Sequence, residues 1–432
     1  MKKISVFLVM VIAPAMVWAQ QRLKLEEAIN IALQRNLNIQ ISKNNLHAAD
    51  IGNHIGMAGG LPTVSAELNA TEQYTSINQT RITGETTKVN FARGNNINTQ
   101  LIASQVLYNG MRVHATKNRL EELEKMSGQE LNSMIQNTIA EVMVQYYDIV
   151  RQQSYTATID SAIRAARQRL DIIKARQSVG LANNVDLFQT EIDVNTLMQQ
   201  YQQQELMVQQ SKADFLRLLA LRPDSSVLVV DTIVVDRNVQ LQQVEADMLR
   251  NPNILAAEHQ VRVMEFIERE TAAQRYPSLR GQVGLNYNRS QAPAGFATLN
   301  QSYGPTIGLG LSIPIFNGGI FKRQQRIAEI DTRNARLQRE NIVQDMQNNL
   351  AKAYFAYQNN LKQLETEQRN YQLAASLLNL IQQRFELGYA TIIEVKDAQA
   401  SFVNAGYRVV NLSFAAKVAE VELKRVGNQV KF

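Results

Sequence analysis

Two stretches in each half of the chain alternate between apolar and polar residues. The apolar members are Val64, Ala66, Leu68 and Ala70 in the first half and Ile307, Leu309, Leu311, Ile313 and Ile315 in the second. Stretches 97–104 and 279–288 alternate less regularly. Because successive side chains of a strand point to opposite faces, the pattern predicts four strands with one apolar and one polar face. Each is about ten residues long, enough for a tilted strand to cross a bilayer, although a soluble β-sandwich would show the same pattern.

A very long helix is predicted in each half. Residues 320–387 contain no Gly and no Pro, and Gly128 is the one such residue between Met111 and Val179. Apolar residues recur at spacings of three and four, as a heptad-like seam does: Ile135, Ile139, Val142, Tyr146 and Ile149, then Val343, Met346, Leu350, Ala353 and Tyr357. A helix of that length extends about 100 Å. An antiparallel coiled coil without a pore is the alternative, and the strand pair joined directly to each long helix argues against it.

Glycine turns end both long helices. The turns are Val179-Gly180-Leu181 and Leu387-Gly388-Tyr389, and glycine is the usual helix terminator. The chain is then expected to return as helices over about 186–219 and 394–426. Pro223 and Pro252 bracket a stretch that joins the halves, in which residues 227–235 form a short apolar run. We expect this linker to contain a short strand or turn and a small helix.

The chain repeats itself once. Tyr108-Asn109-Gly110 returns as Phe316-Asn317-Gly318, an offset of 208 residues, and upstream Asn36 and Pro62 return as Asn251 and Pro277, an offset of 215. A period this long indicates a duplicated half-molecule and not a solenoid repeat. We therefore expect a first repeat over 20–219 and a linker or equatorial segment over 220–240. A signal peptide is expected to precede them, over 1–19. A second repeat over 241–427 and a tail over 428–432 complete the chain.

The first residues predict export from the cytoplasm. Lys2 and Lys3 precede an apolar run that ends in a cleavage-site pattern, Val17-Trp18-Ala19, as in a secretory signal peptide. No other run approaches the 18 apolar residues of a membrane helix. Cysteine is absent, which excludes disulfides and a lipidated N-terminal Cys. The formal charge of +6 falls to +4 without Lys2 and Lys3, and the basic residues are dispersed, which argues against nucleic-acid binding.

No catalytic, metal or cofactor constellation is recognisable. The four histidines, His47, His54, His114 and His259, lack metal-ligand spacing, and solvated helix histidines are the simpler interpretation. There is no Walker A loop, nucleophile elbow or dinucleotide-type glycine fingerprint. We therefore expect a protein that is not an enzyme and needs no cofactor.

The order of these elements resembles the TolC family of bacterial outer-membrane efflux proteins. The residues that carry the resemblance are Leu25-Glu26-Glu27-Ala28-Ile29 with Asn36, Leu61-Pro62, the two Asn-Gly junctions after the strands, and the two glycine turns. The resemblance covers essentially the whole mature chain. It implies a mainly α fold with β: a trimeric transmembrane β-barrel with four strands per protomer, continued by a long periplasmic α-helical barrel.

The resemblance also implies partners and site residues. A homotrimer in outer-membrane lipid would meet a periplasmic adaptor (membrane fusion) protein, itself bound to an RND-type or ABC inner-membrane transporter. The adaptor-docking tips would be Val179, Gly180, Leu181, Leu387, Gly388 and Tyr389. Asp186, Glu394 and Asp397 would form the acidic ring of a periplasmic gate, although carboxylates favoured at helix N-termini are the alternative. Ala390 and Phe385 stand where some members have a gate-locking arginine and a bonding tyrosine, so the closed-state lock is expected to differ here.

The function implied is that of a passive outer-membrane exit duct for a tripartite efflux pump. A channel for type I protein secretion is the nearest alternative, and a non-conducting coiled-coil scaffold is another. Two polar stretches, 76–94 and 290–302, are expected to be the loops that face outward, because outer-membrane barrels keep their longer loops outside.

Overall fold

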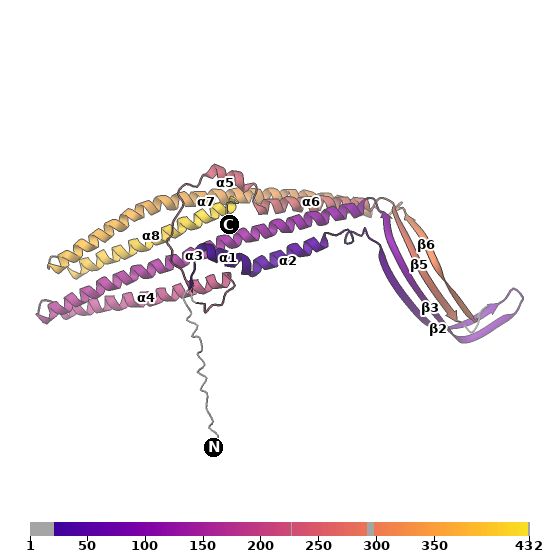
Figure 1. The fold of residues 1–432 in the computed structure, drawn as a ribbon, viewed down its shortest axis with the longest axis horizontal. Coiled ribbons are helices and arrows are strands. Elements are labelled where there is room, and N and C mark those ends of the chain that lie inside the picture. Colours follow the sequence, from indigo (N-terminus) through magenta and orange to yellow (C-terminus); the bar gives the residue numbers. More distant parts are fainter. Residues whose placement is uncertain (1–20, 226, 292–297, 431–432) are drawn as a thin grey trace, which may run out of the picture. The chain divides into compact units, whose positions relative to one another are not determined.

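The computed structural model describes residues 21–225, 227–291 and 298–430 (Figure 1). The predicted signal peptide therefore lies outside the described residues. The described residues form two compact units, one from the described parts of 1–41, 133–251 and 345–432, and the other from the described parts of 42–132 and 252–344. Each unit takes segments from both sequence repeats. The repeats are therefore not spatial domains, and their boundaries stay a prediction about the sequence.

The second unit contains a four-stranded antiparallel sheet in the order β2-β3-β5-β6. The strands are β2 (Thr63–Thr80), β3 (Thr86–Tyr108), β5 (Ser278–Gln291) and β6 (Leu299–Ser312). The expectation of ten residues per strand was too short, because the pairing continues beyond the regular alternation. The expected strand through Ile315 was too long at its end, since β6 stops at Ser312 and Pro314 cannot donate to a ladder.

The expected loop over 76–94 was wrong in most of its length. Strands β2 and β3 continue pairing past a register shift after Thr75, from Ile77 opposite Val89 to Thr80 opposite Thr86. The turn is confined to residues 81–85, where Gly84 has φ +87°. Thr, Ile and Val favour strands, so the polar appearance of this stretch concealed its β propensity. The other expected loop, 290–302, is strand up to Gln291 and from Leu299, and residues 292–297 lie outside the described part.

Ion pairs join the helices of the second unit. The helices of this unit are most of α2 (Leu37–Gly52), the whole of α6 (Pro252–Ala273), and the first parts of α3 (Arg112–Ser178) and α7 (Ile320–Glu386). Arg119–Glu270 joins α3 to α6, and Arg336–Glu265 and Arg339–Glu258 join α6 to α7, all at 2.6–2.7 Å. Glu122 of α3 also lies 2.7 Å from His259 and 3.8 Å from Arg262 of α6. Burial raises the pKa of Glu122, but hydrogen bonds from His259 and Lys125 outweigh it and lower the pKa.

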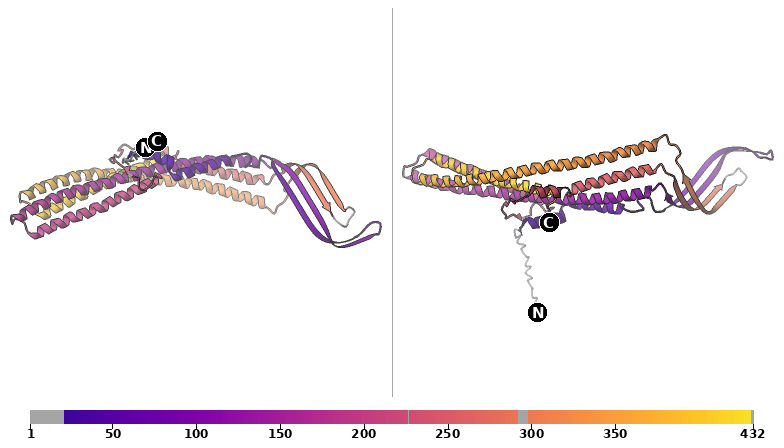
Figure 2. Two further views of the ribbon diagram at one scale, coloured as in Figure 1. Left: turned by 60° about the horizontal axis from the view of Figure 1, so that its bottom comes forward. Right: turned by 90° about the horizontal axis from the view of Figure 1, so that it is seen from above.

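The first unit is built on two helical hairpins (Figure 2). Helix α3 turns into α4 (Asn184–Leu218), and α7 turns into α8 (Ile392–Val426). The returning helices thus begin within two residues of the prediction. Short helices α1 (Leu25–Arg35) and α5 (Leu241–Met248) complete the unit, with β1 (Gln21–Arg22) parallel to β4 (Val227–Leu228). Sequence patterns missed β1 because two residues are too few to alternate. Tyr146 and Phe215, both fully buried, centre a core that α1, α3 and α4 share.

The duplication is also present in the hydrogen bonds. The buried side chain of Asn36 donates from Nδ2 to the Leu218 carbonyl at the end of α4, at 2.9 Å. Asn251 donates in the same way to the Val426 carbonyl at the end of α8, at 3.1 Å. The two donors differ by 215 residues and the two acceptors by 208, which are the two offsets of the sequence repeat. Each half therefore closes its returning helix with the same asparagine contact.

Candidate functional site

One face of the sheet is apolar across all four strands. The pairing aligns the alternating residues into rows: Val64–Ala103–Val283–Ile307, Ala66–Leu101–Leu285–Pro305 and Leu68–Thr99–Tyr287–Tyr303. Further rows contain Leu309 and then Leu311 with Leu279. From Leu279 to Tyr287 the apolar face extends roughly 27 Å along the strand, at about 3.4 Å per residue. A tilted strand of that length is comparable with the apolar band of outer-membrane barrels, about 25 Å tall.

This apolar face is exposed. Ile307 is 84% exposed, Leu309 74% and Leu68 69%. An ordered apolar surface of this extent marks contact with lipid or with another chain. A soluble sandwich would bury such a face against a second sheet, and no element of the described chain covers it. Tyr287 and Tyr303, paired on the last apolar row, are aromatic residues of the kind found where such a band meets water.

The two glycine turns have the same backbone geometry. Gly180 has φ +78° and Gly388 has φ +83°. The amide of Leu181 donates to the Arg176 carbonyl at 2.8 Å, and the amide of Tyr389 donates to the Arg384 carbonyl at 2.8 Å. This is the six-to-one bond of a Schellman motif, which requires a left-handed residue just after the helix. A side-chain Cβ at either glycine would meet no atom within 4 Å. The glycines are therefore required by backbone conformation and not by close packing.

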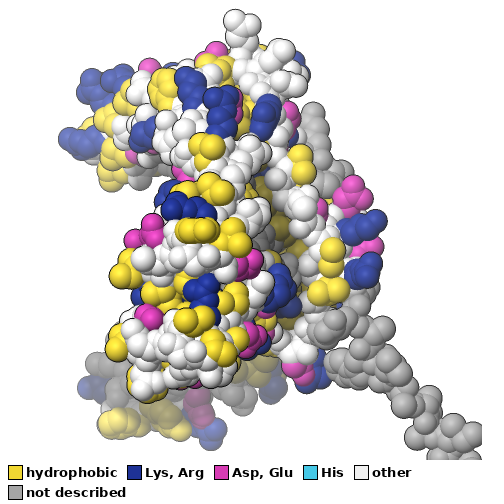
Figure 3. Space-filling view, turned by 90° about the vertical axis from the view of Figure 1, so that its left-hand side faces the viewer, with side chains coloured by type: hydrophobic (Ala, Val, Ile, Leu, Met, Phe, Trp, Pro, Cys, Tyr) yellow, Lys and Arg dark blue, Asp and Glu magenta, His cyan; other side chains and the backbone are white. Residues whose placement is uncertain are grey.

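Large apolar side chains are exposed at both turns. The predicted tip residues Val179, Leu181, Leu387 and Tyr389 are 68%, 78%, 73% and 73% exposed. Three more exposed apolar residues belong to the same ends of the hairpins and escaped the sequence reasoning: Val185, Phe188 and Ile393. In Figure 3, which looks at this end, charged side chains of both signs are interspersed with hydrophobic ones. We call these seven exposed residues the tip patch, a surface suited to a protein partner.

The two hairpins are joined just behind the turns. Phe385, 5% exposed, packs with Ile173 and Val395 in a small apolar cluster, and Ala390 is partly buried against it. The Arg176 guanidinium lies 4.9 Å from the centre of the Phe385 ring. It also donates from Nη2 to the Phe385 carbonyl at 2.7 Å. The positions where the family lock was expected to differ therefore hold an apolar cluster and an arginine cap.

The three expected gate acids have different surroundings. Asp186 is half-buried in the first turn of α4, and its amide donates to the Asn183 side chain. Glu394 is exposed, and its carboxylate accepts from the Thr391 amide at 2.6 Å and hydroxyl at 2.9 Å, forming a capping box. The backbone hydrogen bond and then the hydroxyl lower the pKa of Glu394. Asp397 is exposed on the same helix. Glu394 therefore caps the N-terminus of α8, as the alternative interpretation expected. An acidic ring formed by the three residues stays a prediction.

A buried arginine that sequence reasoning missed connects three helices of the first unit. Arg169 on α3, 4% exposed, donates to Gln399 of α8 at 2.8 Å and pairs with Asp193 of α4 at 3.3 Å. Lys396 also pairs with Asp193, at 3.0 Å. Burial lowers the pKa of Arg169. These residues lie far apart in sequence, and an isolated Arg in a polar helix carries no pattern that would reveal its burial.

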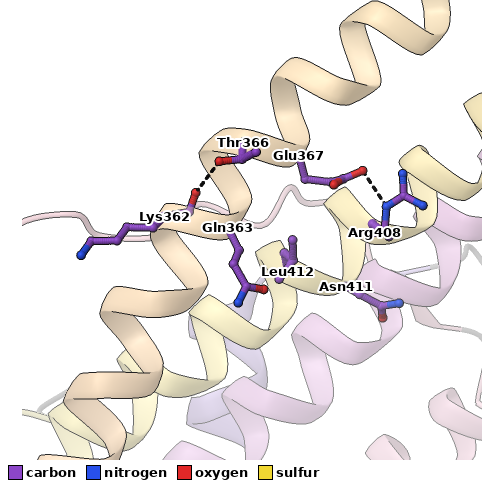
Figure 4. A pocket seen from close by; sticks show the side chains of 7 residues that line it. All are labelled: Lys362, Gln363, Thr366, Glu367, Arg408, Asn411 and Leu412. Atoms are coloured by element: carbon purple, nitrogen blue, oxygen red, sulfur yellow. Dashed lines mark hydrogen bonds and ion pairs between the residues drawn. The ribbon is translucent and has the colours of Figure 1, made fainter.

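A groove with a volume of 530 Å³ lies between α7 and α8 (Figure 4) and is spanned by the Arg408–Glu367 ion pair at 2.7 Å. Its lining residues are Lys362, Gln363, Thr366, Glu367, Arg408, Asn411 and Leu412. Within the described ranges, no group of three or more His, Cys, Asp or Glu side chains could hold a metal ion. No helix in the same ranges is long and apolar enough to cross a membrane.

A family model for outer membrane efflux proteins matches residues 28–221 and again 245–429. The chain belongs to the outer membrane efflux protein family. The double match confirms both the internal duplication and the resemblance to the TolC family. The chain is accordingly an outer-membrane efflux protein of a family of channel proteins.

Relatives of this chain resemble it at low sequence identity and share its fold. It is 22% identical over 318 residues to toxin and drug export protein A of Aggregatibacter actinomycetemcomitans, covering 69% of this chain and 67% of that one. It is 22% identical over 306 residues to outer membrane protein TolC of Vibrio cholerae, covering 67% of each. The solved CmeC outer membrane channel of Campylobacter jejuni matches with a TM-score of 0.76 at 15% identity, over 97% of this chain and 92% of that one. The expected TolC-like fold is confirmed.

Proposed function

We propose that three copies of this chain form one outer-membrane exit duct with a twelve-stranded barrel. The observation that carries the proposal is the exposed apolar face, in register across a sheet whose outer strands, β2 and β6, each have one unpaired edge. Unpaired strand edges are not tolerated in lipid, so a spanning sheet must close. Four strands are too few for a barrel, and closure through neighbouring copies satisfies both edges. The helical part is then periplasmic.

The proposed partners are a periplasmic adaptor protein and an RND-type or ABC inner-membrane transporter. The tip patch supports an adaptor contact, because its apolar side chains surround turns that end the long helices. A relative is named a toxin and drug export protein, which suits conduction of drugs through a tripartite pump. Polypeptide export through a type I secretion system is the second candidate function, because the name of the same relative also includes toxin export. Energy would come from the inner-membrane partner, since the duct itself is passive.

Assembly provides the direct test of this function. The mature chain is expected in the outer-membrane fraction as a trimer, because the free edges of β2 and β6 close only on neighbouring copies. Crosslinking followed by mass measurement in detergent would check the number of copies. Recovery of monomers from the soluble periplasm would overturn the proposal.

Orientation is tested at the turn between β2 and β3. The amide of Gly84 donates to the Arg81 carbonyl at 2.9 Å in a short turn with φ +87° at the glycine. An epitope tag inserted after Gly84 is expected to bind antibody on intact cells, because this turn joins the strand ends opposite the long helix that follows β3. A tag inserted after Gly180 is the matched control and should be reached only in permeabilised cells. The reverse result would invert the orientation.

A further inference from the structure

The polar face of the sheet is almost free of charge. Five rows cross all four strands on this face: Thr63–Ser104–Gln282–Gly308, Ser65–Ile102–Gly284–Thr306, Glu67–Gln100–Asn286–Gly304, Asn69–Asn98–Asn288–Ser302 and Thr71–Asn96–Ser290–Asn300. Amides and hydroxyls dominate these rows. Glu67 is the one charged residue among these described positions. In a closed barrel the rows line the inside, since the opposite face is apolar.

The carboxylate of Glu67 is held at the sheet surface. Gln100, its cross-strand partner, donates from Nε2 to Oε2 of Glu67 at 2.8 Å. The rest of the row cannot neutralise it, because Asn286 is neutral and Gly304 has no side chain. A Cβ at Gly304 would meet no atom within 4 Å, so the space beside the row is open. The nearest basic residue on this face is Arg280, three rows away, or roughly 20 Å along the strand.

The level of Glu67 lies inside the apolar band. On the outer face, its neighbouring rows are those of Ala66 with Leu285 and of Leu68 with Tyr287. Walls of low dielectric focus the field of a fixed charge into the lumen, which raises the local concentration of counter-ions. An amide lining adds no net charge, since amides both donate and accept hydrogen bonds.

We propose that Glu67 is the charge-selecting residue of the barrel segment. The inference rests on the proposed trimeric duct, in which three Glu67 carboxylates stand at one level, the other four complete rows of the polar face are neutral, and Arg280 lies three rows away. They favour the passage of cations and cationic solutes over anionic ones at the outer end of the path. This ring is separate from Glu394 and Asp397, which belong to the helical hairpins.

Single-channel recording in planar bilayers tests the proposal with three purified trimers: the parent, Glu67→Gln and Glu72→Gln. Glu67→Gln keeps the shape and the hydrogen-bonding capacity of the side chain but removes the charge. We expect a severalfold fall in the ratio of cation to anion permeability, and relief of block by a multivalent cation added on the outer side. Glu72→Gln is the matched control, because Glu72 lies on the same strand but on the opposite face, paired with Arg93. Its selectivity should equal that of the parent.

The possible failures are distinguishable. Unchanged selectivity in Glu67→Gln, or an equal change in Glu72→Gln, in channels that conduct like the parent would overturn the role of Glu67 and leave the duct intact. A parent trimer that does not conduct would overturn the proposed function, and this inference with it. Glu67→Lys supplies a further check, since a basic ring at this level must shift the selectivity toward anions.

Discussion

Gly388→Val and Gly180→Val are each expected to abolish export while the trimer still assembles in the outer membrane. Both glycines have positive φ, at +83° and +78°. A β-branched residue is strained there by at least about 1–2 kcal/mol, and the Schellman turn must rearrange to relieve it. Leu387 and Tyr389 flank one turn and Val179 and Leu181 the other, so rearrangement displaces the tip patch that we assign to the adaptor. Export of a drug by cells carrying the variant as their sole copy is the measurement.

Asparagine substitutions provide the control for this experiment. Asn adopts the left-handed conformation far more readily than other non-glycine residues, and space beside both glycines is open. Gly388→Asn and Gly180→Asn should therefore retain export. Full export by both valine variants would remove the docking assignment of the turns. Loss of the trimer in those variants would instead show that the turns are needed for folding.

The features that the sequence predicted best are those with long or repeated patterns. The absence of Gly and Pro over most of two stretches predicted α3 and α7, and the duplicated Val-Gly-Leu and Leu-Gly-Tyr turns located their ends. Alternation predicted four strands and their apolar face. It could not show that rows such as Ala66–Leu101–Leu285–Pro305 are aligned across the sheet, because register depends on pairing between distant segments, as between Asn95 of β3 and Gln291 of β5.

Sequence patterns could not predict contacts between polar residues that are distant in the chain. Arg176 occupies the same repeat position as Arg384, yet Arg176 caps the other hairpin, whereas Arg384 donates to the Tyr389 carbonyl in its own turn. The difference depends on what lies beside each helix, which the repeat does not encode. The extent of β2 and β3 was missed for another reason: a polar strand that meets water on both faces has no apolar alternation to detect. In the sequence, Glu67 is one polar position among several in an alternating stretch. Only the pairing of the four strands shows that its row is otherwise uncharged.

Removal of the charges of Glu394 and Asp397 together is expected to lower the cation selectivity of the duct. The two residues are three apart on α8, so they point to roughly one face, and three copies would place six carboxylates near one axis. Crowded carboxylates attract cations and repel anions. The parent should therefore be blocked by multivalent cations from the periplasmic side, and Glu394→Ala with Asp397→Ala should relieve that block. Because Ala390 and Phe385 stand where the family resemblance implies a polar lock in some members, the resting conductance should exceed that of such members.

The capping box of Glu394 allows its charge to be separated from its structural role. Glu394→Gln keeps a residue type that can close the box but removes the charge, whereas Glu394→Ala loses both. If the Glu394 charge faces the lumen, both variants should lower selectivity alike, and Asp397→Asn should lower it further.

The hydrogen bonds from Thr391 depress the pKa of Glu394 below its usual value of about 4.3. The carboxylate therefore keeps its charge to a lower pH than a glutamate without these hydrogen bonds would, and its contribution to selectivity should be lost as the pH falls through that depressed pKa. Identical selectivity in the parent and the double alanine variant would show that both acids face away from the lumen, so that Glu394 serves only to cap α8.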